Sequence, residues 1–154
     1  MPRVLFVCMG NICRSPTAEA VFRAKAADAG VAHLFDIDSA GTLGAHAGNP
    51  ADARMRAHAS QRGYALTSIA RQVRAEDFEH FDLIVAMDSD NHTDLCGICP
   101  EDHQHKVHMM MDFAPSCAEK DVPDPYYGGP AGFERVLDLI EQAAAGLLAK
   151  QMPK

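Results

Sequence analysis

The chain has 154 residues, of which 47% are hydrophobic and 23% charged, and its formal net charge at pH 7 is −7. This length predicts a single domain over residues 1–154, large enough to bury a core. An acidic chain of this kind is not expected to bind nucleic acid, which requires a basic face, and no apolar run approaches the roughly 20 residues of a membrane helix.

The cysteines and the N-terminus indicate the compartment. Five cysteines are an odd number, and they lack the dense spacing of a disulfide framework, which favours reduced thiols. The apolar run at the N-terminus is only about four or five residues long, too short for a signal peptide. We therefore expect a cytoplasmic protein with no membrane partner.

The first predicted elements are a buried strand and a helix joined by a short loop. Residues 3–8 are almost continuously apolar, as expected for a strand buried on both faces of a parallel sheet. Ser15 fits a helix N-cap with Pro16 at the first helical position. Gly30 is a natural C-terminal stop for this helix. The chain therefore opens with a βα unit.

Apolar runs and helical patterns continue to alternate along the chain. A glycine-rich loop at residues 41–50 interrupts them, and it supports close turns. The predicted elements are, in order, a strand at 34–40, a helix from about 50 to 62 that ends at Gly63, a weak strand at 66–69, a strong strand at 81–87 and a short helix from 88 to about 95.

The C-terminal third combines one weak and one strong pattern. Residues 96–122 show little periodicity, although residues 107–111 could form a last strand. Residues 123–130 contain three prolines and two glycines, which predicts a loop. The final helix has a clear apolar face: Phe133, Val136, Leu137, Ile140, Ala144, Leu147 and Leu148.

Strands that alternate with helices predict an α/β fold, with a parallel sheet and helices on both of its faces. In such folds the ligand crevice lies beyond the carboxyl ends of the strands. Three candidate strand ends deliver Cys8, Gly41-Thr42 and Met87-Asp88 to that side.

The stretch from Cys8 to Ser15 has the composition of a phosphate-binding loop. Successive backbone N–H groups and a helix N-terminus can surround a phosphate dianion. Gly10 permits a positive φ, and Asn11 tolerates one better than most residues. Arg14 can hold two phosphate oxygens at once.

Cys8 is the candidate nucleophile of this loop. A free thiol titrates near pH ~8.5, and amide dipoles, a neighbouring arginine and a helix start favour the thiolate. A hydrogen bond from Ser15 would do the same. Attack on phosphorus would give a cysteinyl-phosphate intermediate that water hydrolyses. Asp124, held between two prolines, is the candidate acid for the leaving group and base for the water.

Each of these features alone has an ordinary structural explanation. A cysteine that ends a buried strand is usually a small core residue. A Ser-Pro pair is usually a helix cap, and Asp124 alone would be interpreted as a solvated turn residue. The position of the pattern between a strand and a helix favours the catalytic interpretation, because the mechanism requires that context.

Residues 7–16, Val-Cys-Met-Gly-Asn-Ile-Cys-Arg-Ser-Pro, closely resemble the signature of the low-molecular-weight protein tyrosine phosphatases. Residues 38–42, 81–88 and 124–128 also resemble that family, so the likeness covers nearly the whole chain in the right order. The resemblance implies an open, flavodoxin-like parallel sheet of about four strands flanked by helices on both faces. It also implies hydrolysis of phosphotyrosine or small aryl phosphates, without a metal or cofactor.

The same resemblance implies a role for each matching residue. Cys8 is the nucleophile, Arg14 the transition-state clamp and Asp124 the acid and base, while Ser39 supports the loop. Cys13 matches a second loop cysteine that can form a protective disulfide with Cys8. The residues implied in substrate binding, including the rim of the cleft, are Met9, Gly10, Asn11, Ile12, Cys13, Ser15, His46, Tyr126 and Tyr127. The expected partners are phosphotyrosine proteins, tyrosine kinases among them.

Two positions depart from the family pattern. Many bacterial members carry an aromatic residue in the cleft wall where this chain has Ala45, with His46 beside it. A histidine that is frequent before Ala-Arg-Gln is also missing, since residues 68–72 are Ser-Ile-Ala-Arg-Gln. The first difference bears on affinity for aromatic phosphoesters and the second on support for the loop.

Two other functions remain open from the sequence. A thiol-dependent arsenate reductase of the same fold would need a relay of two further thiols, for which Cys96 and Cys99 are candidates. A metal-binding module could instead draw its ligands from the segment 96–117, because Cys-x2-Cys is a recognised half-site. The candidate ligands are Cys96, Cys99, His103, His105, His108 and Cys117.

Overall fold

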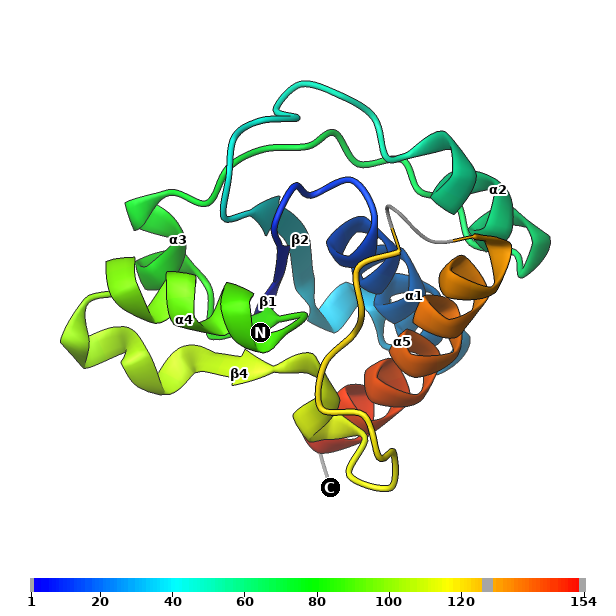
Figure 1. Cartoon of the computed structure of the whole chain (residues 1–154). Coiled ribbons are helices and arrows are strands. Elements are labelled where there is room, and N and C mark those ends of the chain that lie inside the picture. The colour runs from blue at the N-terminus through cyan, green and yellow to red at the C-terminus, as the bar shows by residue number, and fades with distance from the viewer. Residues whose placement is uncertain (1, 126–128, 153–154) are drawn as a thin grey trace.

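The computed structural model describes residues 2–125 and 129–152 (Figure 1). Four strands form one all-parallel sheet in the order β2-β1-β3-β4. The strands are β1 (Arg3–Cys8), β2 (Asp36–Gly41), β3 (Leu83–Ala86) and β4 (Val107–Met109). The α-helices are α1 (Arg14–Asp28), α2 (Ala53–Gln61), α3 (Ala75–His80), α4 (Ser89–Ile98) and α5 (Pro130–Gln151). Three 3₁₀ turns are η1 (Ala32–Leu34), η2 (Glu101–Lys106) and η3 (Met110–Phe113).

The central strand β1 is buried on both faces of the sheet. Its residues Val4 to Val7 are completely buried, and Val4 pairs with Ile37 of β2 and with Leu83 of β3. A strand that contacts helices on both sides has no polar face, which is why its sequence is continuously apolar. The predicted parallel α/β sheet is confirmed.

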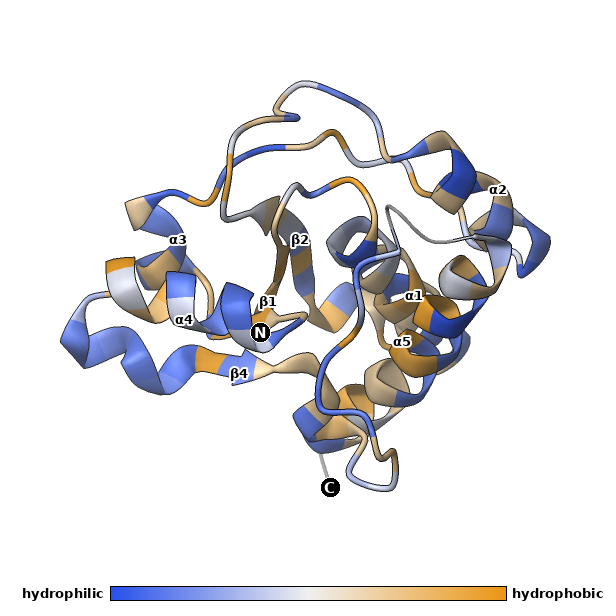
Figure 2. Cartoon of the chain, in the orientation of Figure 1, coloured by the Kyte–Doolittle hydropathy of each residue, from blue (hydrophilic) through white to orange (hydrophobic). Residues whose placement is uncertain are grey.

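Two layers of helices cover the sheet. Phe6 points into a core formed with α1 and α5, whereas Leu5 and Val7 point into a second core formed with α3 and α4. In Figure 1, α1 and α5 lie together on one side of the sheet and α3 and α4 on the other. Figure 2 shows that α5 is hydrophobic along the face that meets α1. All seven residues of its predicted apolar face are buried.

Several boundaries differ from the sequence predictions. Ser15 was expected as the N-cap of the first helix, but α1 begins at Arg14 with Cys13 as its N-cap residue. The prediction was wrong because the Ser15 hydroxyl bonds to Cys8 rather than to the helix backbone. The short helix α3 was not predicted at all. Residues 66–69 form no strand, and only a single bridge joins Ile69 to Pro50.

The carboxyl ends of three strands meet at one edge of the sheet. The Thr42 N–H donates to the carbonyl of Cys8 (2.9 Å), and the Met87 N–H donates to the carbonyl of Val7 (3.0 Å). The loops after β1, β2 and β3 are therefore fixed to one another by backbone hydrogen bonds. Within the described part of the chain, no helix is both long enough and apolar enough to cross a membrane.

Candidate active site

The nucleophile loop, residues 8–15, connects β1 to α1 and arches over the end of the sheet (Figure 1). None of the backbone N–H groups of residues 9–14 has a hydrogen-bond acceptor among the described residues. These donors stand at the N-terminus of a 15-residue helix, where the partial positive charge of the helix dipole adds to theirs. The loop is thus built to bind an anion.

Asn11 has the special backbone conformation of this loop. Its φ is +59°, the left-handed region that few residues other than glycine occupy. Of the two residues that could adopt a positive φ here, Asn11 does so and Gly10 does not. A Cβ at position 10 would lie 2.9 Å from Cδ2 of His46, so any other residue there would displace the imidazole. The imidazole therefore rests on the loop backbone.

A chain of hydrogen bonds behind the loop ends on the Cys8 sulfur. The amide nitrogen of Asn11 donates to the hydroxyls of Ser15 (2.8 Å) and Ser39 (3.0 Å). The Ser39 hydroxyl in turn donates to the Glu19 carboxylate (2.6 Å). Ser15 Oγ lies 3.0 Å from Cys8 Sγ and 3.4 Å from the carbonyl of Ala40. Since the Ser15 oxygen already accepts from Asn11, its own hydrogen is available for the sulfur, the nearer acceptor.

The guanidinium of Arg14 is buried beside this sulfur, with only 3% of the side chain exposed. Its Nη1 donates to Asp88 Oδ2 (2.5 Å) and to the carbonyl of Val122 (3.0 Å). Burial acts to lower the pKa of Arg14, but the negative charges of Cys8 and Asp88 outweigh it and raise the pKa. Arg14 therefore remains a fixed cation, held on one edge by two acceptors.

A cavity of about 170 Å³ opens above the loop. Its lining brings together residues from three separate segments of the chain: Cys8, Met9, Gly10, Ile12, Cys13, Arg14, His46 and Asp124. Asp124 Oδ2 lies 3.8 Å from Nη2 of Arg14, and about a third of the Asp124 side chain is exposed. A thiol, a guanidinium and a partly exposed carboxylate thus face one small space.

The two cysteines of the loop differ in their surroundings. Among the described residues no hydrogen-bond donor reaches the Cys13 sulfur, and only 4% of the residue is exposed. Burial, followed by the negative charges of Asp52 and Cys8, raises its pKa to about 12. Cys13 therefore remains a neutral thiol at physiological pH, whereas Cys8 receives the hydrogen bond of Ser15.

Most residues predicted for the site come together in the structure. Eight line the cavity, and Asn11, Ser15 and Ser39 form the network behind it. Tyr126 and Tyr127 lie outside the described residues. Glu19 and Asp88, which contact Ser39 and Arg14, were not predicted as site residues. Asp88 was recognisable only as an acid that follows a buried strand at the same edge of the sheet.

The segment 96–117 does not form a comparable site. Nowhere in residues 2–125 and 129–152 do three His, Cys, Asp or Glu side chains lie close enough to hold a metal ion. Cys96 and Cys99 lie at the C-terminal end of α4, whereas its N-terminal cap Asp88 contacts Arg14. Burial, followed by the charge of Cys96, also raises the pKa of the Cys99 thiol. Neither the metal-binding nor the arsenate-reductase alternative gains support from this geometry.

Comparisons with known proteins agree with the geometry of the loop. The family model for low molecular weight phosphotyrosine protein phosphatase matches residues 3–154. A low molecular weight protein-tyrosine-phosphatase of Streptomyces coelicolor is 49% identical over 150 residues, which are 96% of this chain and 92% of that protein. The crystal structure of a protein tyrosine phosphatase from Entamoeba histolytica has a TM-score of 0.95 at 46% identity and covers 97% of this chain and 96% of its own. The structure of YfkJ from Bacillus subtilis has a TM-score of 0.92 at 40% identity and covers 97% of this chain and 94% of its own.

Proposed function

Since the chain belongs to the low molecular weight phosphotyrosine protein phosphatase family, we propose that Cys8, Arg14 and Asp124 carry out its reaction. The enzyme is a protein-tyrosine phosphatase that hydrolyses phosphate monoesters through a cysteinyl-phosphate intermediate. The proposal concerns which residues perform each step, and it assigns the whole of residues 1–154 to one phosphatase domain. The observation that carries it is the convergence of a thiol, a guanidinium and a carboxylate on one cavity.

In the first step the Cys8 thiolate attacks phosphorus. The bond between sulfur and phosphorus forms as the bond to the ester oxygen breaks, and the departing oxygen takes its proton from the Asp124 carboxylic acid. In the second step the Asp124 carboxylate accepts a proton from water, which attacks phosphorus. The bond between sulfur and phosphorus then breaks, releasing inorganic phosphate and restoring the thiolate.

The loop and Arg14 would stabilise the negative charge on the three non-bridging oxygens of the phosphoryl group while it is transferred to Cys8. Both hydrogens of Nη1 are used by Asp88 and Val122, so the Nε and Nη2 edge is left as a pair of parallel donors. The N–H groups of residues 9–14 provide the remaining donors. Such preorganised donors act most strongly on charge that develops in the transition state.

The other residues would adapt the site to its substrate. His46 forms a wall of the cavity, and Ala45 beside it provides no aromatic ring, so the imidazole would contact the leaving group. We assign Met9 and Ile12 to the same contact. For Tyr126 and Tyr127, which lie outside the described residues, we propose contact with the substrate at the rim of the cleft. Cys13, as a neutral neighbour of Cys8, would form the disulfide that protects the nucleophile.

The partners follow from this chemistry. The substrates would be phosphotyrosine proteins, with tyrosine kinases that carry phosphotyrosine among them, or small aryl phosphates. We also propose a cytoplasmic location, because all five cysteines are free thiols, which suits a reducing compartment.

Trapping of the intermediate tests these assignments. With an aryl phosphate that has a good leaving group, Asp124→Asn should form the intermediate faster than it hydrolyses it. Mass spectrometry of acid-quenched enzyme should then find a phosphoryl group on the peptide that contains Cys8. With a poor leaving group the same variant should lose about 10²–10³-fold in kcat, and clearly less with a good one. Asp90→Asn, on the exposed side of α4, is the control and should behave as the parent. Equal losses for all leaving groups, or phosphate on another residue, would refute the assignments.

A further inference from the structure

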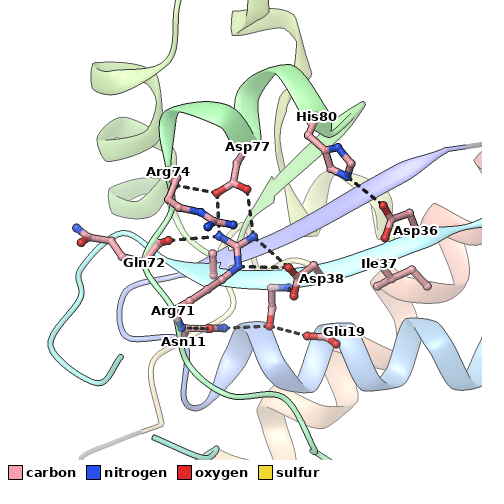
Figure 3. Close-up of polar contacts among 12 residues, drawn as sticks. Asn11, Glu19, Asp36, Ile37, Asp38, Arg71, Gln72, Arg74, Asp77 and His80 are labelled. Carbon is pink, nitrogen blue, oxygen red and sulfur yellow. Dashed lines mark hydrogen bonds and ion pairs between the residues drawn. The ribbon is translucent and has the colours of Figure 1, made fainter. Parts of the chain in front are cut away.

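The Arg71 side chain forms an extensive set of hydrogen bonds, although Arg71 has no role in the reaction proposed above. Its Nε donates to Asp38 Oδ2 (3.2 Å), and its Nη2 donates to Asp38 Oδ2 and to Asp77 Oδ1 (both 3.1 Å). Its Nη1 donates to Asp77 Oδ2 (2.9 Å) and to the carbonyl of Gln72 (3.3 Å). All five N–H donors of the guanidinium therefore have an acceptor (Figure 3).

The two carboxylates belong to regular elements that flank this side chain. Asp38 lies in the edge strand β2, and its Oδ1 also accepts the backbone N–H of Ser39 (2.8 Å). Asp77 is only 4% exposed and caps α3 by accepting the backbone N–H of Arg74 (2.8 Å). Residue 71 itself lies in the irregular connection between α2 and α3. The guanidinium thus fixes an irregular segment to a strand and a helix.

The backbone of Arg71 touches the catalytic network. Its N–H donates to Oδ1 of Asn11 (3.0 Å), and its carbonyl accepts the N–H of Gly41 (2.8 Å). Asn11 has left-handed backbone, a conformation that persists only when its surroundings hold it. The amide oxygen of Asn11 is fixed by the backbone N–H of Arg71, so its amide nitrogen points at Ser15 and Ser39.

We propose that Arg71 is a positioning residue for the phosphatase reaction, acting through its backbone N–H on Asn11 and thereby on the Ser15 hydrogen bond to Cys8. The inference rests on the proposed role of Cys8. Asp38 and Asp77 hold the side chain so that the backbone amide cannot move. When this anchor is loosened, Asn11 turns, and the Ser15 hydroxyl can donate to the carbonyl of Ala40 instead of the sulfur.

The test compares two arginines of equal exposure. The side chains of Arg71 and Arg62 are both 23% exposed, and Arg62 binds the α5 carboxylates of Glu134, Asp138 and Glu141, away from the loop. Arg71→Lys and Arg62→Lys each keep the charge but remove the planar fork. The readout is the rate of Cys8 alkylation by iodoacetamide against pH, followed by mass spectrometry of the Cys8 peptide, alongside kcat and KM for an aryl phosphate.

Arg71→Lys should move the midpoint of the alkylation profile upward by about half a pH unit or more and lower kcat by about tenfold, because the sulfur loses a hydrogen bond. Arg62→Lys should lower the melting temperature without moving either quantity. Asp77→Asn, which leaves Arg71 in place, should give a smaller shift in the same direction and serves if Arg71→Lys does not fold. In an Asn11→Ala background, Arg71→Lys should cause no further shift.

Two outcomes would overturn the proposal. One is an alkylation profile for Arg71→Lys, or for Asp77→Asn, that superimposes on that of Arg62→Lys. The other is a full additional shift in the Asn11→Ala background. Alkylation of Cys8 needs no turnover, so these outcomes are independent of whether Cys8 is the nucleophile, which the trapping experiment decides.

Discussion

The nucleophile loop and the cysteine–histidine segment (residues 96–117) contain similar residue types but differ in how their polar groups are used. In the loop, hydrogen bonds from Asn11 and Ser15 lead to one sulfur atom. In the cysteine–histidine segment the polar groups bond to separate partners: the Cys117 thiol donates to Gln142, and Lys106 donates to the carbonyl of Phe78. Gln104 donates to the carbonyls of Cys96 and Cys99, both at 2.8 Å. Reactive residue types therefore form a site only where donors converge on one atom.

The arrangement of the backbone causes this difference. The loop crosses the carboxyl ends of parallel strands, where strand ends and a helix start leave unpaired N–H groups that point at one space. The cysteine–histidine segment contains the end of α4, a 3₁₀ turn and the edge strand β4. Its strand β4 pairs with β3, and no three His, Cys, Asp or Glu side chains of the described residues lie together in it. Substitutions should therefore affect chemistry in the first region and only stability in the second.

The largest expected contrast is between two cysteines. Cys8→Ser should lower kcat for an aryl phosphate by at least about 10⁴-fold, because a serine hydroxyl is a poor nucleophile without a general base. Cys96→Ser should retain activity within about twofold, since the Cys96 sulfur has only a 3.7 Å contact with His92. Steady-state kinetics of both purified variants check this. A comparable loss of kcat in both variants would contradict the conclusion that only the nucleophile loop is catalytic.

A glycine outside the loop should show the next largest effect, on stability alone. A Cβ on Gly146 of α5 would lie 1.9 Å from the carbonyl oxygen of Phe113. Gly146→Ala must therefore push α5 away from η3, which we expect to lower the free energy of unfolding by about 1–3 kcal/mol. Chemical denaturation measures this, and kcat per folded molecule should be unchanged.

Gly97→Ala is the matched control for that substitution. Gly97 lies within α4, and a Cβ there would meet nothing within 4 Å. Alanine should therefore stabilise the helix by up to about 1 kcal/mol. A loss of stability in Gly97→Ala, or none in Gly146→Ala, would contradict the packing described for these two helices.

The two regions differ in how well their sites could be predicted from the sequence. The nucleophile loop was predictable because its strand, donors, guanidinium and helix start are contiguous within residues 3–16. Glu19 and Asp88 were not, because their roles depend on contacts with Ser39 and Arg14 across the sheet edge. The sequence of the cysteine–histidine segment suggested a ligand cluster that the described residues do not form. The spacing of cysteines and histidines along the chain does not determine where their side chains point.

The same reasoning explains the secondary structure that was missed. Helix α3 is six residues long and buries only Asp77 and Phe78, so it carries no apolar period to recognise. Residues 66–69, Leu-Thr-Ser-Ile, were a weak strand prediction, but Ile69 is 55% exposed and forms only an isolated bridge with Pro50. The long elements were predictable because burial on a whole face leaves a repeated pattern, as in α5.

Removal of the last hydrogen bond of the network should have a smaller effect than removal of the nucleophile. Ser15→Ala deletes the hydroxyl that lies 3.0 Å from the Cys8 sulfur. We expect kcat to fall by about tenfold, the value of one hydrogen bond to a charged group. Thr17→Val is the control, because it removes a buried hydroxyl of the same helix that bonds only to the carbonyl of Cys13 (2.7 Å). Kinetics in which Thr17→Val loses as much as Ser15→Ala would mean that disturbance of α1, and not the bond to Cys8, lowers the rate.

The smallest expected effect concerns the pH dependence of stability in the cysteine–histidine segment. Burial lowers the pKa of His108 below its ordinary 6.5, and the charges of Lys150 and the neighbouring His105 and His92 act in the same direction against Asp112. The unfolded chain therefore binds a proton at this position before the folded chain does. Stability should fall as pH drops below 6.5 and level off once the folded form is also protonated.

His108→Gln should remove that part of the pH dependence. The melting temperature of the variant should change less between pH 7 and pH 5.5 than that of the parent, whereas replacement of the exposed His33 by glutamine should leave the parental slope. Activity of His108→Gln at pH 7 should match the parent, because the side chain packs against Phe113 and not against the loop. An altered kcat in His108→Gln would show that the two regions are coupled, although among the described residues the His108 ring packs against Phe113 and not against residues 8–15.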